Sequence, residues 1–135
     1  EVVDHFSLEG GSKGIGPLAL DEANSRILVG LRRNPRLAVL DIDSGKDTAT
    51  CPIPEGADDM FLDAESKLIY VSCNSGFVAV IRQVDADHYA PIGTIQTTKG
   101  AKTSFYDPAL KRLYLAVPRW SGRNGPEIWV YQARP

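Results

Sequence analysis

The stretch Gly56–Lys99 reads GADDMFLDAESKLIYVSCNSGFVAVIRQVDADHYAPIGTIQTTK, and it decides the fold because related stretches flank it. The upstream copy is GIGPLALDEANSRILVG and the downstream copy is GAKTSFYDPALKRLYLAV. In each copy a glycine precedes an aspartate by seven residues, and a polar turn, a basic residue and an apolar run follow. The pairs are Gly14/Asp21, Gly56/Asp63 and Gly100/Asp107, so the copies start 42 and 44 residues apart.

A period near 40 residues with several short apolar runs in each copy is typical of β-propeller blades. Turn-forming Asn, Asp, Gly and Pro residues separate the runs, and no helical period persists beyond one turn. The sequence therefore predicts an all-β chain, a single partial β-propeller over residues 1–135 with about three four-stranded blades. We place two blades at residues 14–53 and 56–97 and an incomplete one at 100–133.

The second apolar run of each copy predicts how the blades pack. These runs are almost continuously apolar: Ile27–Val29, Leu68–Val71 and Leu113–Val117. A sheet with one wet face would instead alternate apolar and polar residues along each strand. We therefore expect these strands to be buried on both faces, between neighbouring blades.

The two ends of the chain look unfinished in this scheme. The blade at 100–133 offers three strands, and Val2–Leu8 predicts a strand with no partner before it. We expect residues 1–10 to form the outer strand of a neighbouring blade, and this strand can complete the last blade. Three blades fall below the 4–8 that usually close a ring. Either two copies form one six-bladed ring, or the remaining blades of a larger propeller complete it.

Several segments resemble a known repeat family. LALDEANSRILVG, RLAVLDIDSGKDTATCPIPEG and FYDPALKRLYLAV resemble the YVTN-type β-propeller repeat of bacterial surface and periplasmic proteins. In that repeat, D-P-x-x-x-x-L-Y-V is followed by V-x-V-I-D and then by a strand ending in I-P-x-G. The chain departs from it at Ile81-Arg82 and at Val130-Tyr131. The resemblance implies a propeller scaffold and a periplasmic or secreted location, and it is not specific to one function.

Composition argues against several classes of partner. The 15 Lys and Arg residues nearly balance the 17 Asp and Glu residues, which argues against nucleic-acid binding. The apolar runs are far shorter than the roughly 20 residues of a membrane span. Cys51 and Cys73 fall in different blades without metal-type spacing, which favours two core thiols. The only histidines are His5 and His88, so we expect no metal site and no cofactor.

Two aspartate patterns are better explained by turns than by chemistry. Asp21, Asp63 and Asp107 recur at the start of tight turns, where a carboxylate caps backbone N–H groups. The segment Asp41–Asp47 has alternating carboxylates, but an EF-hand loop that began at Asp41 would have Pro52 where it needs a glutamate. We therefore expect a hairpin turn there.

We place the candidate binding site on the face that carries the loops between blades and the turns between second and third strands. Basic residues outnumber acidic residues in these loops, which suits an anionic or protein partner. The alternative is that the loops are charged only because they are exposed to solvent. The candidate residues for binding a ligand or partner are Arg32, Arg33, Asp58, Asp59, Lys102, Arg119, Trp120 and Arg123.

We expect a non-enzymatic binding scaffold that uses this mildly basic face for a protein or an anionic small molecule. The alternative is a lactonase-like hydrolase acting at the central channel of the completed propeller, where Asp58, Asp59 and Lys102 would stand. The sequence lacks a G-x-S-x-G nucleophile elbow. We assign no catalytic residue, and the sequence favours a protein that is not an enzyme.

Overall fold

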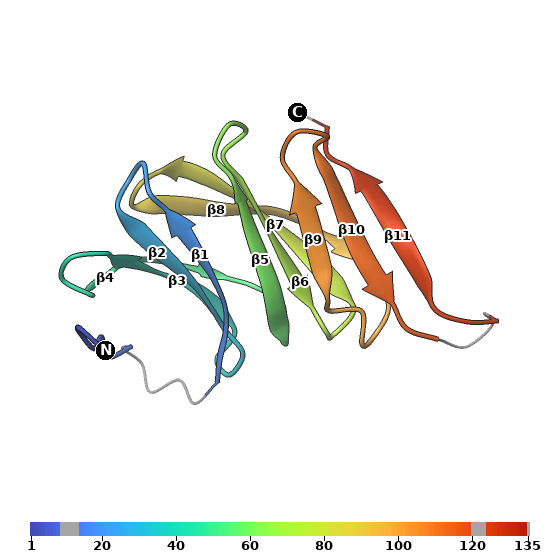
Figure 1. Ribbon diagram of the computed structural model, residues 1–135, viewed down its shortest axis with the longest axis horizontal. Helices are drawn as coiled ribbons and strands as arrows, with labels where there is room; N and C mark the ends of the chain where they lie inside the picture. Colours follow the sequence, from blue (N-terminus) through green and yellow to red (C-terminus); the bar gives the residue numbers. More distant parts are fainter. Residues whose placement is uncertain (9–13, 120–123, 135) are drawn as a thin grey trace.

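The computed structural model describes residues 1–8, 14–119 and 124–134, and its strands form three antiparallel sheets (Figure 1). The first sheet is blade one, with β1 (Ile15–Asp21), β2 (Arg26–Leu31), β3 (Arg36–Asp41) and β4 (Asp47–Pro52). Blade two has β5 (Ala57–Asp63), β6 (Leu68–Cys73), β7 (Phe77–Asp85) and β8 (His88–Gln96). Blade three has β9 (Ser104–Asp107), β10 (Arg112–Val117) and β11 (Glu127–Gln132).

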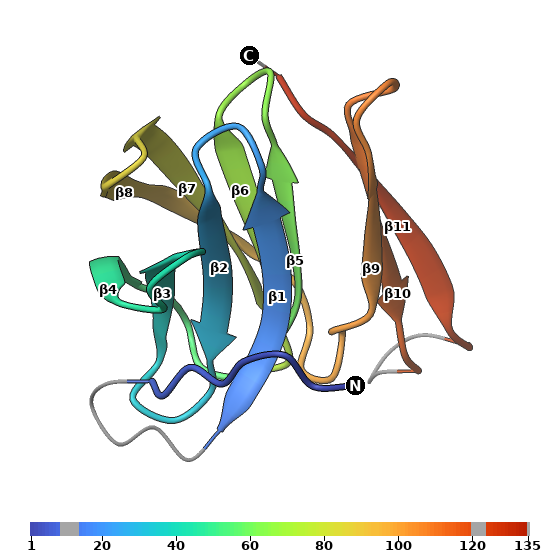
Figure 2. The ribbon, with the colours of Figure 1, turned by 60° about the vertical axis from the view of Figure 1, so that its left-hand side comes forward.

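This arrangement confirms the prediction of an all-β partial propeller with about three blades. Within each blade the strands are paired in chain order, as expected for a propeller blade. The first strands of the blades, β1, β5 and β9, lie side by side in both views (Figures 1 and 2). No helix among the described residues is long and apolar enough to cross a membrane.

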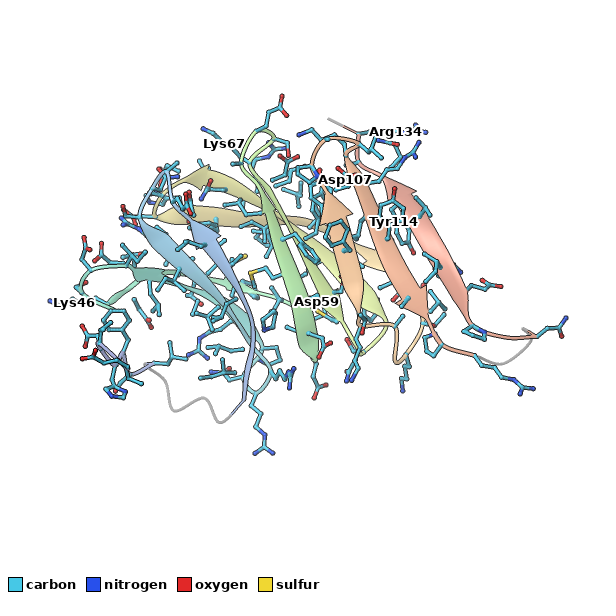
Figure 3. All side chains as sticks on the ribbon, viewed as in Figure 1. Lys46, Asp59, Lys67, Asp107, Tyr114 and Arg134 are labelled. Atoms are coloured by element: carbon cyan, nitrogen blue, oxygen red, sulfur yellow. The ribbon has the colours of Figure 1, made fainter. Side chains whose placement is uncertain are left out.

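The strands run between two edges of the molecule. We call one the loop-rich edge, where the first strands begin; its described residues are 32–36, 54–59, 74–76, 97–103, 118–119 and 124–127. We call the other the turn-rich edge, which holds residues 21–26, 41–47, 63–68, 85–88 and 107–112. Figure 3 shows Asp59 toward the loop-rich end of β5 and Asp107 at the turn-rich end of β9.

The repeated turns share a backbone geometry that the sequence encodes. Four residues after each recurring aspartate, Ser25, Lys67 and Lys111 adopt left-handed φ values of 54°, 57° and 55°. At the loop-rich edge, Gly56 has a φ of 84°, and a Cβ atom there would overlap the side chain of Asn74. The Asn74 N–H donates to the Gly56 carbonyl at 2.9 Å, so this glycine lets two loops of blade two approach closely.

Two layers of core join the blades. Between blades one and two lie Leu28, Val39, Ile69, Val71 and Ile81, all fully buried. Cys51 and Cys73 belong to the same layer as buried free thiols in different blades, as predicted. The buried residues of the layer between blades two and three are Leu68, Tyr70, Val78, Tyr106 and Leu113.

The burial of the second strands differs between blade two and blade three. All six residues of β6 are buried, which confirms the predicted burial on both faces for blade two. Along β10, burial instead alternates, because Leu113, Leu115 and Val117 face blade two while no other blade of the described residues covers the opposite face. The same prediction is therefore wrong for β10.

Residues 1–8 form no strand within this chain, so the strand expected to join a neighbouring blade stays a prediction. The Phe6 ring lies against Gly45 in the turn between β3 and β4, where a Cβ atom would overlap it. Leu8 packs against the outward-facing residues of blade one, including Val29 and Leu40. A strand forms along a free sheet edge with unpaired N–H and C=O groups, and this segment instead contacts a turn and a sheet face.

Candidate functional site

Arg32 joins blade one to blade two at the loop-rich edge. Its Nε donates to the Ala57 carbonyl at 2.9 Å, and its Nη2 lies 3.0 Å from Asp58 Oδ1. The close approach requires Gly16, where a Cβ atom would come within 2.7 Å of the Ala57 oxygen. Half-exposed ion pairs contribute little to stability, so the main effect of this pair is to fix the position of the Asp58 carboxylate at the start of β5.

Asp59 makes the corresponding link from blade two to blade three. Its Oδ2 accepts a hydrogen bond from the Ser104 N–H at 2.7 Å. Burial raises the pKa of Asp59, the nearby Asp58 charge adds to this, and the Ser104 N–H acts in the opposite direction. The start of β5 thus carries two carboxylates: Asp58 is paired with Arg32, and Asp59 has a raised pKa.

A groove of about 440 Å³ lies beside these residues, where β9 and β11 begin. Lys102 and Glu127 are its charged lining residues, with Gly100, Thr103, Pro118 and Ile128 among the others. The Glu127 carboxylate accepts a hydrogen bond from Trp129 Nε1 at 2.6 Å. Lys99, Lys102 and Arg119 are exposed around the groove, so cationic side chains dominate the accessible charge here.

The structure brings together some predicted site residues and separates others. Arg32, Asp58 and Asp59 gather at the start of β5, while Lys102 and Arg119 flank the groove of blade three. Arg33 is exposed in the turn between β2 and β3. Trp120 and Arg123 lie outside the described residues. Among the described residues, no three His, Cys, Asp or Glu side chains come close enough to hold a metal ion.

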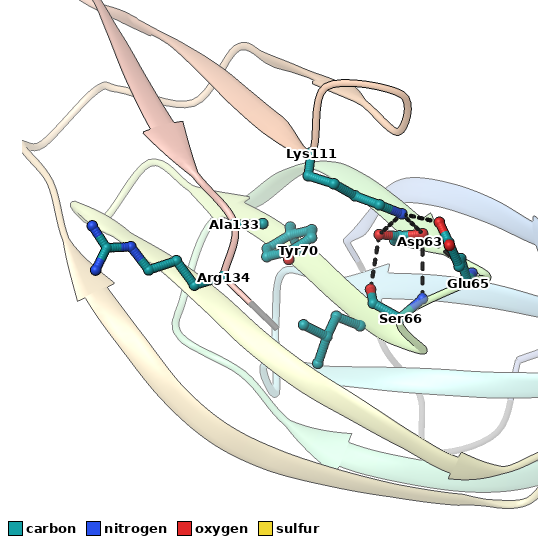
Figure 4. A pocket seen from close by; sticks show the side chains of 8 residues that line it. Asp63, Glu65, Ser66, Tyr70, Lys111, Ala133 and Arg134 are labelled. Atoms are coloured by element: carbon teal, nitrogen blue, oxygen red, sulfur yellow. Dashed lines mark hydrogen bonds and ion pairs between the residues drawn. The ribbon is translucent and has the colours of Figure 1, made fainter.

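A second polar cluster, at the turn-rich edge, centres on Asp63 (Figure 4). Asp63 is 2% exposed, and it accepts hydrogen bonds from Lys111 Nζ at 2.9 Å and from the Tyr106 hydroxyl at 2.8 Å. Lys111 Nζ also lies 2.6 Å from Glu65 Oε2. Burial alone raises the pKa of Asp63, but the hydrogen bonds from Lys111, Ser66 and Tyr106 outweigh it and lower the pKa to about 2.

The predicted turn-capping role of Asp63 is confirmed but incomplete. Asp63 caps its own turn, since it accepts from the Glu65 N–H at 3.2 Å. Its cross-blade donors, Tyr106 and Lys111, stand one residue before and four residues after the next recurring aspartate. Comparing these positions between copies could have suggested the contact. A cavity of about 330 Å³ adjoins the cluster, yet its lysine and carboxylates already bind one another.

Asp41 confirms the hairpin turn predicted between β3 and β4. Its Oδ1 accepts from the Asp43 N–H at 3.1 Å and from the Ser44 N–H at 2.8 Å. The hydrogen bond from the Ser44 N–H is the largest influence that lowers the pKa of Asp41. The residues that resembled a calcium loop are therefore occupied by turn hydrogen bonds.

Comparisons with known proteins bear on the fold. No family model and no curated protein matches the sequence. Among solved structures, Kuenenia stuttgartiensis hydrazine synthase is similar, with a TM-score of 0.73, 15% identity and coverage of 87% of this chain and 34% of its own. A putative 6-phosphogluconolactonase from Bacteroides uniformis has a TM-score of 0.71, 16% identity and coverage of 90% and 37%.

The Myceliophteria thermophila Cps50 (Swd1) β-propeller domain is similar too, with a TM-score of 0.65 and 10% identity. The match covers 85% of this chain and 39% of that domain's chain. The chain thus spans between a third and two fifths of the length of these three structures. At such low identity the likeness concerns the fold, and that fold is the β-propeller.

Proposed function

We propose that this chain is a non-enzymatic β-propeller binding scaffold whose loop-rich edge recognises negatively charged groups on a protein or a small molecule. The observation that carries the proposal is the imbalance between accessible cations and occupied carboxylates. Lys99, Lys102 and Arg119 are exposed, whereas Asp58 is paired with Arg32 and Asp59 with the Ser104 N–H. A partner that approaches this edge therefore meets positive charge first.

The scaffold would act within a complete ring. Rings usually need 4–8 blades, so we propose that a second copy or the remaining blades of a larger propeller close it. The motif FYDPALKRLYLAV supports membership of the YVTN-type repeat proteins, and with it a periplasmic or secreted location. These assignments rest on the resemblance of the repeats.

Anion titration tests the binding proposal. Citrate and pyrophosphate are added separately to the isotope-labelled chain, and amide chemical shifts are followed by NMR. We expect the shifts to concentrate at residues 97–103 and 119, and to weaken at least several-fold when Lys102→Glu is combined with Arg119→Glu. The matched control reverses two exposed lysines of the turn-rich edge, Lys46→Glu and Lys67→Glu. Shifts that weaken equally in both variants would move the site away from this edge.

A lactonase-like hydrolase at the central channel is the second candidate. The similarity to a putative 6-phosphogluconolactonase favours it, together with the raised pKa of Asp59 beside the start of β5. A raised pKa makes a carboxyl group a better proton acceptor than an ordinary aspartate, which is the direction that general acid–base catalysis needs. Hydrolysis of a sugar lactone, measured with and without divalent metal, separates the candidates. Turnover that Asp59→Asn abolishes supports the hydrolase, and no turnover by the complete ring supports the scaffold.

A further inference from the structure

Blade three has an open face that repeats five positions of a face already used inside the molecule, and it departs from that face where Arg112 takes the place of the buried Leu68. The covered face is the side of blade two that packs on blade three. Its residues are Phe61, Tyr70, Ser72, Val78 and Val80, and the matching residues of the open face are Phe105, Tyr114, Ala116, Ile128 and Val130. The matches follow from the distance to the recurring aspartate and from the strand register.

Exposure separates the two faces although their chemistry is alike. Val78 is fully buried, whereas Ile128 is 64% exposed at the equivalent position. Phe105 and Val130 are 63% and 55% exposed. Leu37, the equivalent of Val78 in blade one, is also fully buried because blade two covers it. An apolar surface of this kind marks an interaction site.

The recurring aspartates identify what the open face lacks. Asp21 in blade one accepts a hydrogen bond from Gln83 Nε2 of blade two at 2.6 Å. Asp63 in blade two accepts from Tyr106 and Lys111 of blade three. Both aspartates are almost fully buried, at 3% and 2% exposure. Each one therefore receives a donor side chain from the next blade in the chain.

Asp107 occupies the same position in blade three and has no such donor. Its Oδ1 accepts from the Ala109 N–H at 2.9 Å and from the Leu110 N–H at 3.2 Å, which caps its own turn. Among the described residues, no side chain donates a hydrogen bond to it. The open face of blade three thus presents the same apolar residues and carboxylate acceptor that blade two presents to blade three. The opposite half of this interface is missing from the described residues.

We propose that the open face of blade three binds a further β-propeller blade, which inserts a Tyr, Lys or Gln donor opposite Asp107. This inference rests on the propeller assembly proposed above and adds the surface and the polar contact that define the partner. A blade is the fitting occupant because blade three itself covers the matching face of blade two.

A second copy of the chain fits this face less well. The cross-blade donors Tyr106, Lys111 and Gln83 correspond in blade one to Leu20, Ser25 and Ile42. Blade one therefore offers Asp107 two apolar side chains and one serine. Its outward face is also in contact with Leu8 of the N-terminal segment. The occupant is thus a blade with donors of the kind that blades two and three carry.

The test extends the full chain by one blade built from its own sequence. A copy of residues 86–134 is joined after Arg134, so that the copied β8 can add a fourth strand to blade three. The copied β9–β11 then follow as a fourth blade that carries copies of Tyr106 and Lys111. The control extension carries Tyr106→Phe and Lys111→Met in the copy alone. Melting temperature, circular dichroism and light scattering are measured for each chain.

We expect Asp107→Asn to lower the melting temperature of the extended chain by about 2 °C or more, and to leave the original chain and the control extension within about 1 °C. Asn retains the oxygen that caps the turn, so the difference reports the cross-blade contact. Equal effects in all three chains would overturn the proposal. An extension that stays unfolded counts against it too, because the open face should supply the contacts that fold it.

Light scattering tests whether a second copy of the chain binds the open face of blade three instead. If the original chain runs at twice its mass and Phe105→Glu returns it to a monomer, the face binds a second copy and the proposal is wrong. Ala116 and Ile128 of this face also line the groove at the loop-rich edge, so an added blade would cover part of that groove. The melting temperatures and masses measured here do not depend on anion binding, so failure of the binding proposal is distinguishable from failure of this one.

Discussion

Blade two and blade three derive from related repeats, yet they differ in what surrounds them. In blade two, β6 buries every residue, and Tyr70 is only 6% exposed. In blade three, β10 buries alternate residues, and Tyr114 is partly exposed on its open face (Figure 3). A tyrosine at the same repeat position is therefore core in one blade and surface in the other.

The comparison shows that the neighbouring blade determines which hydrogen bonds a repeated residue makes. Asp63 and Asp107 each cap a turn, and the sequence predicts that role for both. Only Asp63 also accepts from Tyr106 and Lys111, because blade three places these donors against it. The role of a repeat position thus depends on residues about one repeat further along the chain.

The largest expected contrast comes from truncating the matched tyrosines. Tyr70→Ala removes a buried ring that stacks near Tyr106, with centroids 4.9 Å apart, and should cost about 3–5 kcal/mol. Tyr114→Ala removes a partly exposed ring and should cost less than about 1 kcal/mol. Urea unfolding followed by fluorescence measures both. Equal costs would mean that the open face of blade three is covered in solution.

The next contrast concerns the recurring aspartates. Asp63→Asn keeps the shape and the turn cap but removes the charge that Lys111 and Tyr106 bind, at a cost of about 2–3 kcal/mol. Asp107→Asn in the same chain should stay within about 0.5 kcal/mol. Combining Asp63→Asn with Lys111→Met provides the control: the pair should lose less than the sum of the single changes, because the two residues interact.

Lowering the pH should reveal the contribution of the Asp63 charge without mutation of Lys111 or Tyr106. The pKa of Asp63 is lowered to about 2 from an ordinary value near 3.8, so its charged form is stabilised in the folded chain. That stabilisation, about 2 kcal/mol, is complete above the ordinary pKa and is lost as pH falls from about 4 to 2. Unfolding measured across this window should be less pH-dependent in Asp63→Asn than in the wild type. Parallel curves would contradict the contribution of Asp63.

The sequence predicts the blades well because each repeat contains its own turn residues and apolar runs. Turn residues such as Gly56 and the polar turn after Asp63 define where strands end, and apolar runs such as Leu68–Val71 define which strands lie inside. Contacts between blades are harder to predict, since Arg32 meets Asp58 and Asp63 meets Lys111 across 26 and 48 residues. Val2–Leu8 has the composition of a strand, but its pairing depends on a neighbouring blade, and within this chain it contacts a turn and a sheet face instead.

The smallest contrast uses the residues that follow the matched tyrosines by two positions. The Ser72 hydroxyl is buried and lies 2.7 Å from the Ser104 hydroxyl of blade three. Ser72→Ala should cost about 1 kcal/mol, because Ser104 loses that hydrogen bond within the interface. The reciprocal change, Ala116→Ser, introduces a hydroxyl on the open face and should stay within about 0.5 kcal/mol. If Ala116→Ser were as costly as Ser72→Ala, its hydroxyl would have entered a dry interface, and the face of blade three would already have a partner.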